Sequence, residues 1–457
     1  MSKMIEIIVD NKTYSVEEGS LLIDLLIKEE IKVPYFCYHE SLGTDGNCRM
    51  CMVEIAGQKR PQIACDTFIK AGMEVNSKSE NINKVRTNIL ELELINHPVD
   101  CPTCDQAGEC SLQDFYMDYG LHDAKVNIAE KVKHEKHVDL GSNVMLDQER
   151  CVLCARCTRF TDKITHTHEL GIVGRGDEAK VSTMPGRKLD NSYAMNVVDL
   201  CPVGALTSKD FRFHQRVWFL KSADSVCQGC AKGCNIYIDH NRPKYQDDVI
   251  YRFRPRRNDE VNGFFICDEG RMSYKELETN RQENILFEGE VVDEMEAIER
   301  YKALFSQYRG EVTVVIDANL YSEEIEAIVT YSKSIEAKVY VPLACYDDPS
   351  FADEMLKSAK RAANYATVIE MGLETIMPTD IGLLINFNHS TPIKAKAEIF
   401  FSTHQGDRKN LIFPIAAFSE NSGSLTNEDG IVQWCEKAVE KNSQAPTIIR
   451  WIEKVQE

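Results

Sequence analysis

The sequence predicts several domains, with α+β folds first and an α/β fold last. At about 100 to 200 residues per domain, 457 residues allow three to four domains, each able to bury its own core. All 17 cysteines except Cys345 and Cys435 fall into four groups within the first 267 residues. From residue 312 onward, apolar segments alternate between strand and helix periodicity. The early domains are therefore expected to be organised around cysteines, and the last one around a sheet.

Composition excludes several classes of function. The formal net charge of -19 argues against a nucleic-acid partner, because a phosphate backbone demands a basic surface. No apolar run reaches the roughly 18 residues of a membrane span, so no direct membrane insertion is expected. The N-terminus has no signal-peptide pattern, which predicts a reducing, cytoplasmic location and argues against a disulfide framework.

Residues 1–80 predict a small, strand-rich domain. Strand patterns at 5–9 and 12–16 flank an Asp10-Asn11 turn, and 21–30 has helical spacing. The next cysteines follow a C-x10-C-x2-C-x13-C order, with glycines in the loop that let backbone N–H groups approach sulfur. This pattern predicts a 2Fe-2S site. The first group is Cys37, Cys48, Cys51 and Cys65.

The second group follows a predicted helix at 81–96, within a segment of residues 81–120. It consists of Cys101, Cys104 and Cys110. Three cysteines do not complete a four-ligand 4Fe-4S site, and His97 is the nearest candidate for the fourth ligand. An imidazole in place of a thiolate makes a site less negative and should raise its reduction potential.

The third group lies in the domain expected at 137–215. A C-x2-C-x2-C run is closed by a remote cysteine followed by proline, as in bacterial 4Fe-4S ferredoxins. The third group is Cys151, Cys154, Cys157 and Cys201. Between its two parts, residues 171–176 are rich in glycine but lack the G-x-G-x-x-G order and a clear preceding strand. They predict a turn without a dinucleotide site.

The fourth group lies in a segment of residues 220–275 and again has 4Fe-4S spacing. It is Cys227, Cys230, Cys234 and Cys267. A polar linker is expected at 274–289, and residues 285–457 then predict a doubly wound α/β domain. Its expected strands are 312–316, 337–341, 381–385 and 397–401, with a helix at 322–335.

Three regions of the chain resemble a known family. HPVDCPTCDQAGECSLQD at 97–114 is similar to the histidine-ligated cluster segment of the large iron-sulfur subunit of respiratory complex I, the bacterial NADH-quinone oxidoreductase. NVVDLCPVGALT at 196–207 resembles the closing segment of its next cluster. Residues 411–414 and 427–433 resemble the end of that family's molybdopterin-oxidoreductase-like domain.

The resemblance implies a β-grasp 2Fe-2S ferredoxin-like domain, a His/Cys 4Fe-4S segment, a 4Fe-4S ferredoxin-like domain and a truncated molybdopterin-oxidoreductase-like α/β domain. It implies one 2Fe-2S and three 4Fe-4S clusters held by the 15 grouped cysteines and His97, without catalytic residues. Electrons would arrive from a flavin in an NADH-binding partner subunit and leave through further iron-sulfur subunits towards quinone. The chain would then sit at the inner (plasma) membrane through its partners. Because only 190 residues follow Cys267, a bound molybdopterin is not expected.

Other interpretations remain open at this stage. Cys-x-x-Cys pairs also bind zinc, although four groups in one chain favour iron-sulfur clusters. Molybdenum catalysis, as in a formate dehydrogenase, would need a metal-ligating thiol, whereas Cys345 and Cys435 are predicted to be small buried side chains. The chain could also serve an NAD-linked hydrogenase, or use its clusters only to staple the fold. The basic run at 252–257 is expected to face solvent or a partner.

Overall fold

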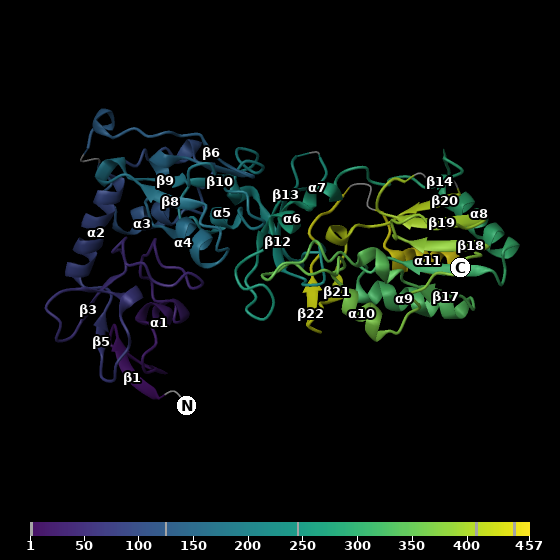
Figure 1. The fold of residues 1–457 in the computed structure, drawn as a ribbon, viewed down its shortest axis with the longest axis horizontal. Coiled ribbons are helices and arrows are strands. Elements are labelled where there is room, and N and C mark those ends of the chain that lie inside the picture. Colours follow the sequence, from purple (N-terminus) through teal and green to yellow (C-terminus); the bar gives the residue numbers. More distant parts are fainter. Residues whose placement is uncertain (1–2, 124–125, 245, 407–409, 442–444) are drawn as a thin grey trace. The chain divides into compact units, whose positions relative to one another are not determined.

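The computed structural model describes residues 3–123, 126–244, 246–406, 410–441 and 445–457. The chain forms two compact units, Met1–Phe219 and Leu220–Glu457 (Figure 1). Both units mix helices with several small sheets, which confirms the multi-domain α+β and α/β prediction. No helix among the described residues has the length and apolar character needed to cross a membrane.

The first sheet of unit 1 has the strand order β2-β1-β5-β3-β4. The expected hairpin forms, with both turn residues in the left-handed region (Asp10 φ 50°, Asn11 φ 69°), as a tight two-residue hairpin loop requires. The inward residues of β1 pack on Leu22 and Leu26 of α1, so the alternation in the sequence becomes one buried sheet face. The elements are β1 (Met4–Val9), β2 (Lys12–Glu17), α1 (Leu22–Lys28), β3 (Met52–Ile55), β4 (Gln62–Ile63) and β5 (Glu74–Asn76).

The predicted helix at 81–96 is α2 (Glu80–Leu94), and α3 (Ser111–Tyr119) follows the second cysteine group. Ser79 caps α2, because its hydroxyl accepts a hydrogen bond from the N–H of Ile82 at 3.1 Å. Arg86, only 1% exposed, donates from α2 to the carbonyl oxygens of Ser77 and Met52, each at 2.9 Å. The helix is thereby fixed to the domain that precedes it.

The rest of unit 1 consists of short elements around the third cysteine group. They are β6 (Val138–Gly141), β7 (Val144–Leu146), α4 (Arg156–Lys163), β8 (Leu170–Val173), β9 (Lys180–Thr183), α5 (Asn196–Leu200) and β10 (Leu206–Ser208). The prediction of a turn at 171–176 is wrong for residues 171–173, which belong to β8 and pair with β9. The chain turns only from Gly174 (φ 80°), where a Cβ would come within 2.5 Å of the Glu178 carbonyl oxygen.

Unit 2 begins with an antiparallel sheet that carries the fourth cysteine group. Its strands are β11 (Lys221–Val226), β12 (Asn235–Asn241) and β13 (Val249–Pro255), and the short helix α6 (Asp268–Met272) starts directly after Cys267. A hairpin of β21 (Gly423–Thr426) and β22 (Val432–Cys435) lies beside β11. Residues from the two ends of unit 2 therefore meet at this sheet.

The larger sheet of unit 2 has the order β15-β14-β20-β19-β18-β16-β17, and its strands from β20 to β17 are parallel. The strands are β14 (Leu286–Phe287), β15 (Glu290–Val291), β16 (Val312–Ile316), β17 (Lys338–Tyr340), β18 (Leu383–Phe387), β19 (Ala397–Ser402) and β20 (Leu411–Pro414). The helices are α7 (Tyr274–Leu277), α8 (Glu294–Gln307), α9 (Ser322–Ser334), α10 (Tyr365–Glu370) and α11 (Ile448–Gln456).

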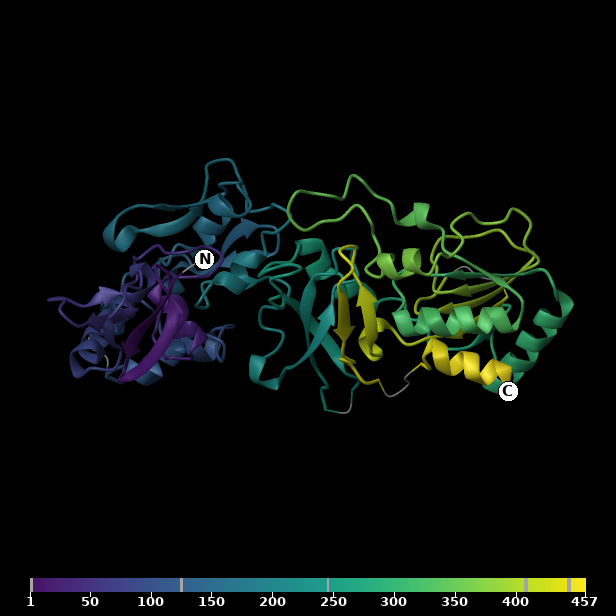
Figure 2. The ribbon, with the colours of Figure 1, turned by 90° about the horizontal axis from the view of Figure 1, so that it is seen from below.

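Two expectations for this domain need correction. The segment expected as a linker contains α7 and β14, and β14 pairs with β20, so it is part of the sheet. The doubly wound arrangement is only half present: α8, α9 and α11 share one core with one face of the sheet, and Val368 of α10 belongs to the same core (Figure 2). On the other face, loop residues Met377, Ile393 and Ala395 pack against Val315 and Leu384.

Candidate metal centres

The structure brings the first cysteine group together. Its four side chains are 0–6% exposed, and hydrogen bonds between sulfurs join Cys37 to Cys48 and Cys65, and Cys65 to Cys51. These bonds to Cys48 and Cys65 hold the pKa of Cys37 well below its ordinary value. The backbone N–H of Phe36 also donates to Cys48 Sγ at 3.4 Å. Four converging sulfurs with backbone donors fit an iron-sulfur cluster.

The four cysteines of the third group line one small cavity of about 20 Å³. Burial raises the pKa of all four thiols, that of Cys154 to about 12, and the neighbouring cysteines raise several of them further. Buried thiols of this kind ionise only when a cation compensates their charge, so metal binding would release their protons. Leu153 (φ 48°) and Ala155 (φ 59°) adopt left-handed backbone between the cysteines, and the N–H of Leu153 points to Cys151 Sγ at 3.4 Å.

In the second group, Cys104 and Cys110 are buried and Cys101 is partly buried. Burial raises the pKa of Cys110 to about 11, and the Cys104 thiol contributes in the same direction. Burial also raises the pKa of the Cys104 thiol, and Cys101 contributes in the same direction. These interactions indicate that Cys104 lies near both Cys101 and Cys110, and the three thiols as one ligand set remain a prediction.

His97, the predicted fourth ligand, has Asp100, Arg150, Lys131 and Lys136 as its charged neighbours. Burial lowers the pKa of its imidazole to about 4, so it is neutral at pH 7, the form that ligates metals. Its Nδ1 accepts a hydrogen bond from the N–H of Val99 at 3.1 Å, and Val99 adopts a left-handed φ of 51° that is unusual for a β-branched residue. The imidazole thus accepts its hydrogen bond from the backbone rather than from a thiol. Its role as the fourth ligand remains a prediction.

The fourth group lines a larger cavity of about 730 Å³. The N–H of Gly229 points to Cys227 Sγ at 3.4 Å, and that of Gly270 to Cys267 Sγ at 3.3 Å. A Cβ at Gly270 would lie 2.8 Å from Cys227 Sγ, so glycine is needed for this close approach. The cavity continues to the carboxyl ends of β16, β18 and β19, the usual ligand position of an α/β sheet.

The two ungrouped cysteines differ. Cys435 is buried, as predicted, but Cys345 is exposed, so that expectation is wrong. Cys345 lies in a single 3-10 turn, Leu343–Tyr346. The hydroxyl of Tyr346 donates a hydrogen bond to Asp317 at 2.9 Å, whereas the adjacent Cys345 side chain faces solvent. Among the described residues that line the large cavity, Cys345 does not occur.

Hydrogen bonds join the first group to the third. Asn47, beside Cys48, donates to the carbonyl oxygen of Leu153 at 3.1 Å. Arg156, beside Cys157, donates to the carbonyl oxygens of Tyr38 at 2.6 Å and Leu200 at 3.1 Å. The loops that carry the two groups are therefore in direct contact.

The third group also contacts the second. A Cβ at Gly204, three residues after Cys201, would lie 2.2 Å from Cys104 Sγ. Arg150 forms a bidentate pair with Asp100, at 3.0 Å from Nε to Oδ1 and 2.8 Å from Nη2 to Oδ2. The loops of the third group thus contact those of both the first and the second group. Sequence reasoning missed Arg150, Arg156 and Gly204, whose only signal is their position beside the cysteines.

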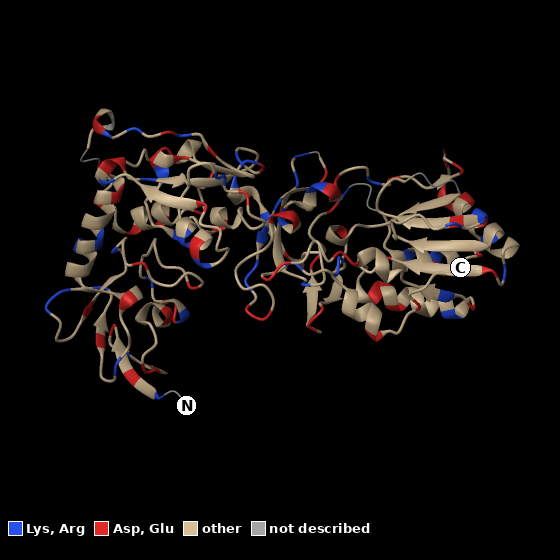
Figure 3. Ribbon diagram, in the orientation of Figure 1, with Lys and Arg blue, Asp and Glu red and all other residues tan. Residues whose placement is uncertain are grey.

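The basic run at 252–257, whose arginines are coloured blue on the ribbon of Figure 3, was expected to face solvent or a partner. Much of it is instead paired inside unit 2. Nε of Arg252 and Nε of Arg254 lie 2.7 and 2.6 Å from Oδ2 of Asp239, which is 1% exposed. Arg256 contacts Asp224 at 3.3 Å. The run therefore serves largely to neutralise carboxylates of the same sheet.

Comparison with known proteins finds four family models along the chain. They are a 2Fe-2S iron-sulfur cluster binding domain at residues 2–80 and the NADH-ubiquinone oxidoreductase-G iron-sulfur binding region at 86–125. These are followed by the ferredoxin-like domain of NADH-quinone oxidoreductase subunit 3 at 141–207 and the molybdopterin oxidoreductase Fe4S4 domain at 220–279. Each matched range contains one cysteine group.

Relatives agree with these models. The chain is 32% identical to the NADH-ubiquinone oxidoreductase 75 kDa subunit of Reclinomonas americana, over 84% of this chain and 56% of that protein. It is 39% identical to the mitochondrial 78 kDa subunit of Neurospora crassa, over 61% of this chain and 37% of that protein. It is 38% identical to the G subunit of NADH-quinone oxidoreductase from Streptomyces coelicolor, over 60% of this chain and 32% of that protein. The chain thus spans about half or less of the length of these relatives.

A solved structure of an NAD+-reducing [NiFe]-hydrogenase in the H2-reduced state is also similar, with 28% identity and a TM-score of 0.42. The similarity covers 47% of this chain and 91% of that one.

The matched domains define the class of protein: an iron-sulfur protein with 2Fe-2S and 4Fe-4S binding domains. Within that class, the chain is similar to the large iron-sulfur subunits of NADH-quinone oxidoreductase, namely the bacterial G subunits and the 75–78 kDa subunits.

Proposed function

We propose that this chain is an electron-transfer subunit of an NADH-quinone oxidoreductase, complex I, which carries electrons from a flavin in a partner subunit towards quinone. The observation that carries the proposal is the contact of three cysteine groups in one unit, in which the third group touches each of the other two. Electron transfer requires redox centres held close together in an interior that excludes water. Separate structural metal sites would not need this arrangement.

The ligand sets follow the groups. The first group would hold one 2Fe-2S cluster, and the third and fourth groups would each hold a 4Fe-4S cluster. The second group would hold a third 4Fe-4S cluster with His97 as the fourth ligand. Bound clusters would supply reversible one-electron transfer, which the side chains themselves do not provide.

The protein's own contribution is ligation, burial and hydrogen bonding. Backbone N–H groups of Phe36, Leu153, Gly229 and Gly270 point to cysteine sulfurs in three of the four groups. Such bonds stabilise negative charge on sulfur and raise the reduction potential of a centre. The contacts between groups support the order first, third, second for electrons that cross unit 1.

The proposed partners follow from this function. An NADH- and flavin-binding subunit would deliver electrons, and further iron-sulfur and quinone-site subunits would accept them. The chain would lie at the cytoplasmic side of the plasma membrane, attached through those subunits.

Two measurements test the proposal. Iron and sulfide analysis of the purified chain should give 14 iron atoms, the sum of one 2Fe-2S and three 4Fe-4S clusters, and electron paramagnetic resonance (EPR) should resolve their signals. Addition of NADH to the assembled complex should then reduce the clusters of unit 1. Stoichiometric zinc in place of iron, or clusters that NADH never reduces, would contradict it.

A further inference from the structure

Arg156 is the first residue of α4 and reaches two cysteine groups at once. One nitrogen of its guanidinium donates to the carbonyl oxygen of Leu200, directly before Cys201, at 3.1 Å. The other donates to the carbonyl oxygen of Tyr38, directly after Cys37, at 2.6 Å. The guanidinium therefore lies between a ligand loop of the third group and one of the first.

The charge of Arg156 is buried and is not neutralised by a carboxylate. The residue is 8% exposed, and both of its hydrogen bonds go to neutral carbonyl oxygens. In the part of the chain that the structure describes, no carboxylate pairs with it, and its Nε is buried without a hydrogen-bond partner. Burial lowers its pKa, but Cys154, Cys201 and Cys37 act to raise it, which places it near sulfurs of both groups. A guanidinium remains charged even there.

Two neighbouring arginines differ from Arg156 in this respect. Arg159, one turn along α4, lies 3.9 Å from Asp45 Oδ1, and its hydrogen bonds reach only carbonyl oxygens of the first-group loop. Arg150, between the third and second groups, is paired with Asp100. Of these three arginines, Arg156 contacts loops of both the first and the third group, and no carboxylate of the described residues pairs with it.

We propose that Arg156 raises the reduction potentials of the clusters in the first and third groups together, as a positive charge shared by both. The inference rests on the proposed function, because it requires clusters at these two sites. An added electron makes a cluster more negative, and a nearby cation in a low-dielectric interior stabilises that reduced state. The same guanidinium acts on both neighbours, so it raises both potentials without widening the difference between them. The driving force for electron transfer between the two clusters is therefore kept while both become easier to reduce.

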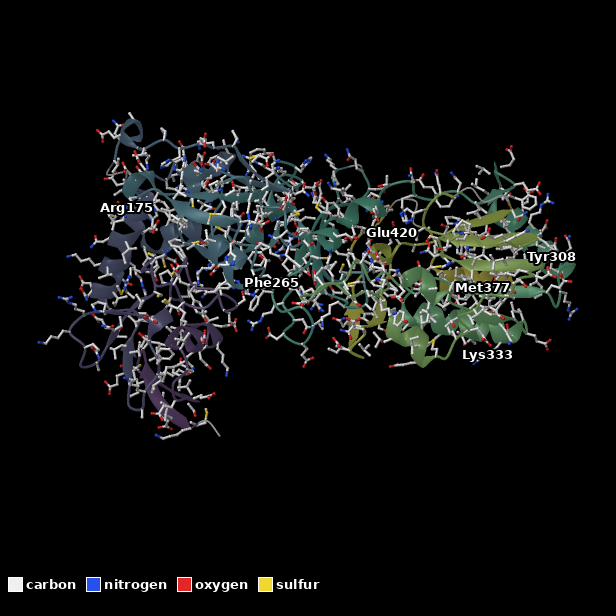
Figure 4. All side chains as sticks on the ribbon, in the orientation of Figure 1. Arg175, Phe265, Tyr308, Lys333, Met377 and Glu420 are labelled. Atoms are coloured by element: carbon white, nitrogen blue, oxygen red, sulfur yellow. The ribbon has the colours of Figure 1, made fainter. Side chains whose placement is uncertain are left out.

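The test is a redox titration of the cluster-loaded full chain, followed by EPR of each cluster. Arg156→Gln should lower the midpoint potentials of the first-group and third-group clusters, each by about 59 mV for a tenfold change in the reduction equilibrium. Arg156→Lys keeps the charge and should recover most of both shifts. Arg159→Gln should shift the first-group cluster alone. Arg175→Gln, at an exposed position in the β8–β9 connection (Figure 4), should shift neither.

Unchanged midpoints in Arg156→Gln, a shift at only one cluster, or an equal fall in Arg156→Lys would each overturn the inference. If Arg156→Gln loses iron, Tyr35→Glu is the second test of the charge. The centre of the Tyr35 ring lies 5.9 Å from the guanidinium. That variant leaves both hydrogen bonds of Arg156 intact and adds an opposing carboxylate. Both midpoints should fall again, and unchanged midpoints would refute the shared charge. Failure of the proposed function would appear separately, as a wild-type chain without these clusters.

Discussion

In the first compact unit, three cysteine groups lie in loops between short helices and strands, and the loops contact one another through Arg150, Arg156 and Gly204. In the second unit, the fourth group shares a core with β12 and β13, but the main core lies elsewhere, between the larger sheet and its helices, and contains no cysteine. In unit 1, the apolar core between the first sheet and α1 includes Cys51 and Cys65. If the proposed clusters are bound, the short elements around the second and third groups are expected to depend on them for structure. Unit 2 has a core that does not include them.

The largest expected effect is that of iron removal. Extraction with a chelator under anaerobic conditions should unfold the part of unit 1 around the second and third groups, because its elements are short and metal binding contributes folding free energy. Amide protection there should fall by more than about a thousandfold, whereas β16 and β18 should keep theirs. Hydrogen exchange followed by mass spectrometry measures both regions in one sample. Equal loss of protection in both regions would remove the distinction between the units.

Gly204→Ala should be the most damaging single substitution in unit 1. The added Cβ would lie 2.2 Å from Cys104 Sγ, so the second-group thiol and the third-group loop could not keep their positions. We expect loss of the second-group cluster, measured as about four fewer iron atoms per chain. Gly171→Ala is the matched control, because its Cβ would meet only the flexible end of Met184, at 3.0 Å. Full iron content in Gly204→Ala would show that the two groups do not depend on this contact.

Gly204 also shows where sequence reasoning ends. Spacing predicted four groups, the hairpin at Asp10-Asn11 and the helix α2, because those signals are local. Contacts between groups depend on residues far apart in the chain, such as Arg156 with Tyr38, and no periodicity encodes them. The left-handed backbone at Leu153 and Val99 was equally hidden, since neither residue type favours it. The linker expectation failed because a polar composition does not exclude a short strand such as β14, which pairs with both β15 and β20.

Glu324 should give unit 2 a pH dependence that is independent of metal. Its carboxyl group is 6% exposed, and burial raises its pKa to about 7 from the ordinary 4.5. Because the folded state holds the proton more tightly, this residue lowers stability as pH rises from about 4.5 to about 7, by about 3 kcal/mol, and has no further effect above that. Glu324→Gln should remove this slope and stabilise unit 2 at pH 8.

Urea unfolding at pH 5 and pH 8 measures the difference, followed by the fluorescence of Trp451, which is buried in the main core. Gln keeps an oxygen that can accept the N–H of Tyr321, so the α9 cap is retained in the variant. Glu326→Gln, at an exposed position on the same helix, is the control. An unchanged slope in Glu324→Gln would assign the pH dependence to another group.

The smallest effect is expected from the ion pair between the second and third groups. The Asp100 side chain is 29% exposed, and Lys136 also contacts it at 3.3 Å, so loss of Arg150 leaves the carboxylate partly compensated. A double-mutant cycle of Arg150→Gln and Asp100→Asn should therefore give a coupling free energy of only about 1 kcal/mol in the unfolding of unit 1. A coupling of about 3 kcal/mol or more would show that the pair behaves as a buried one. In that case unit 1 would be held together by charge pairing between its groups as well as by its metal centres.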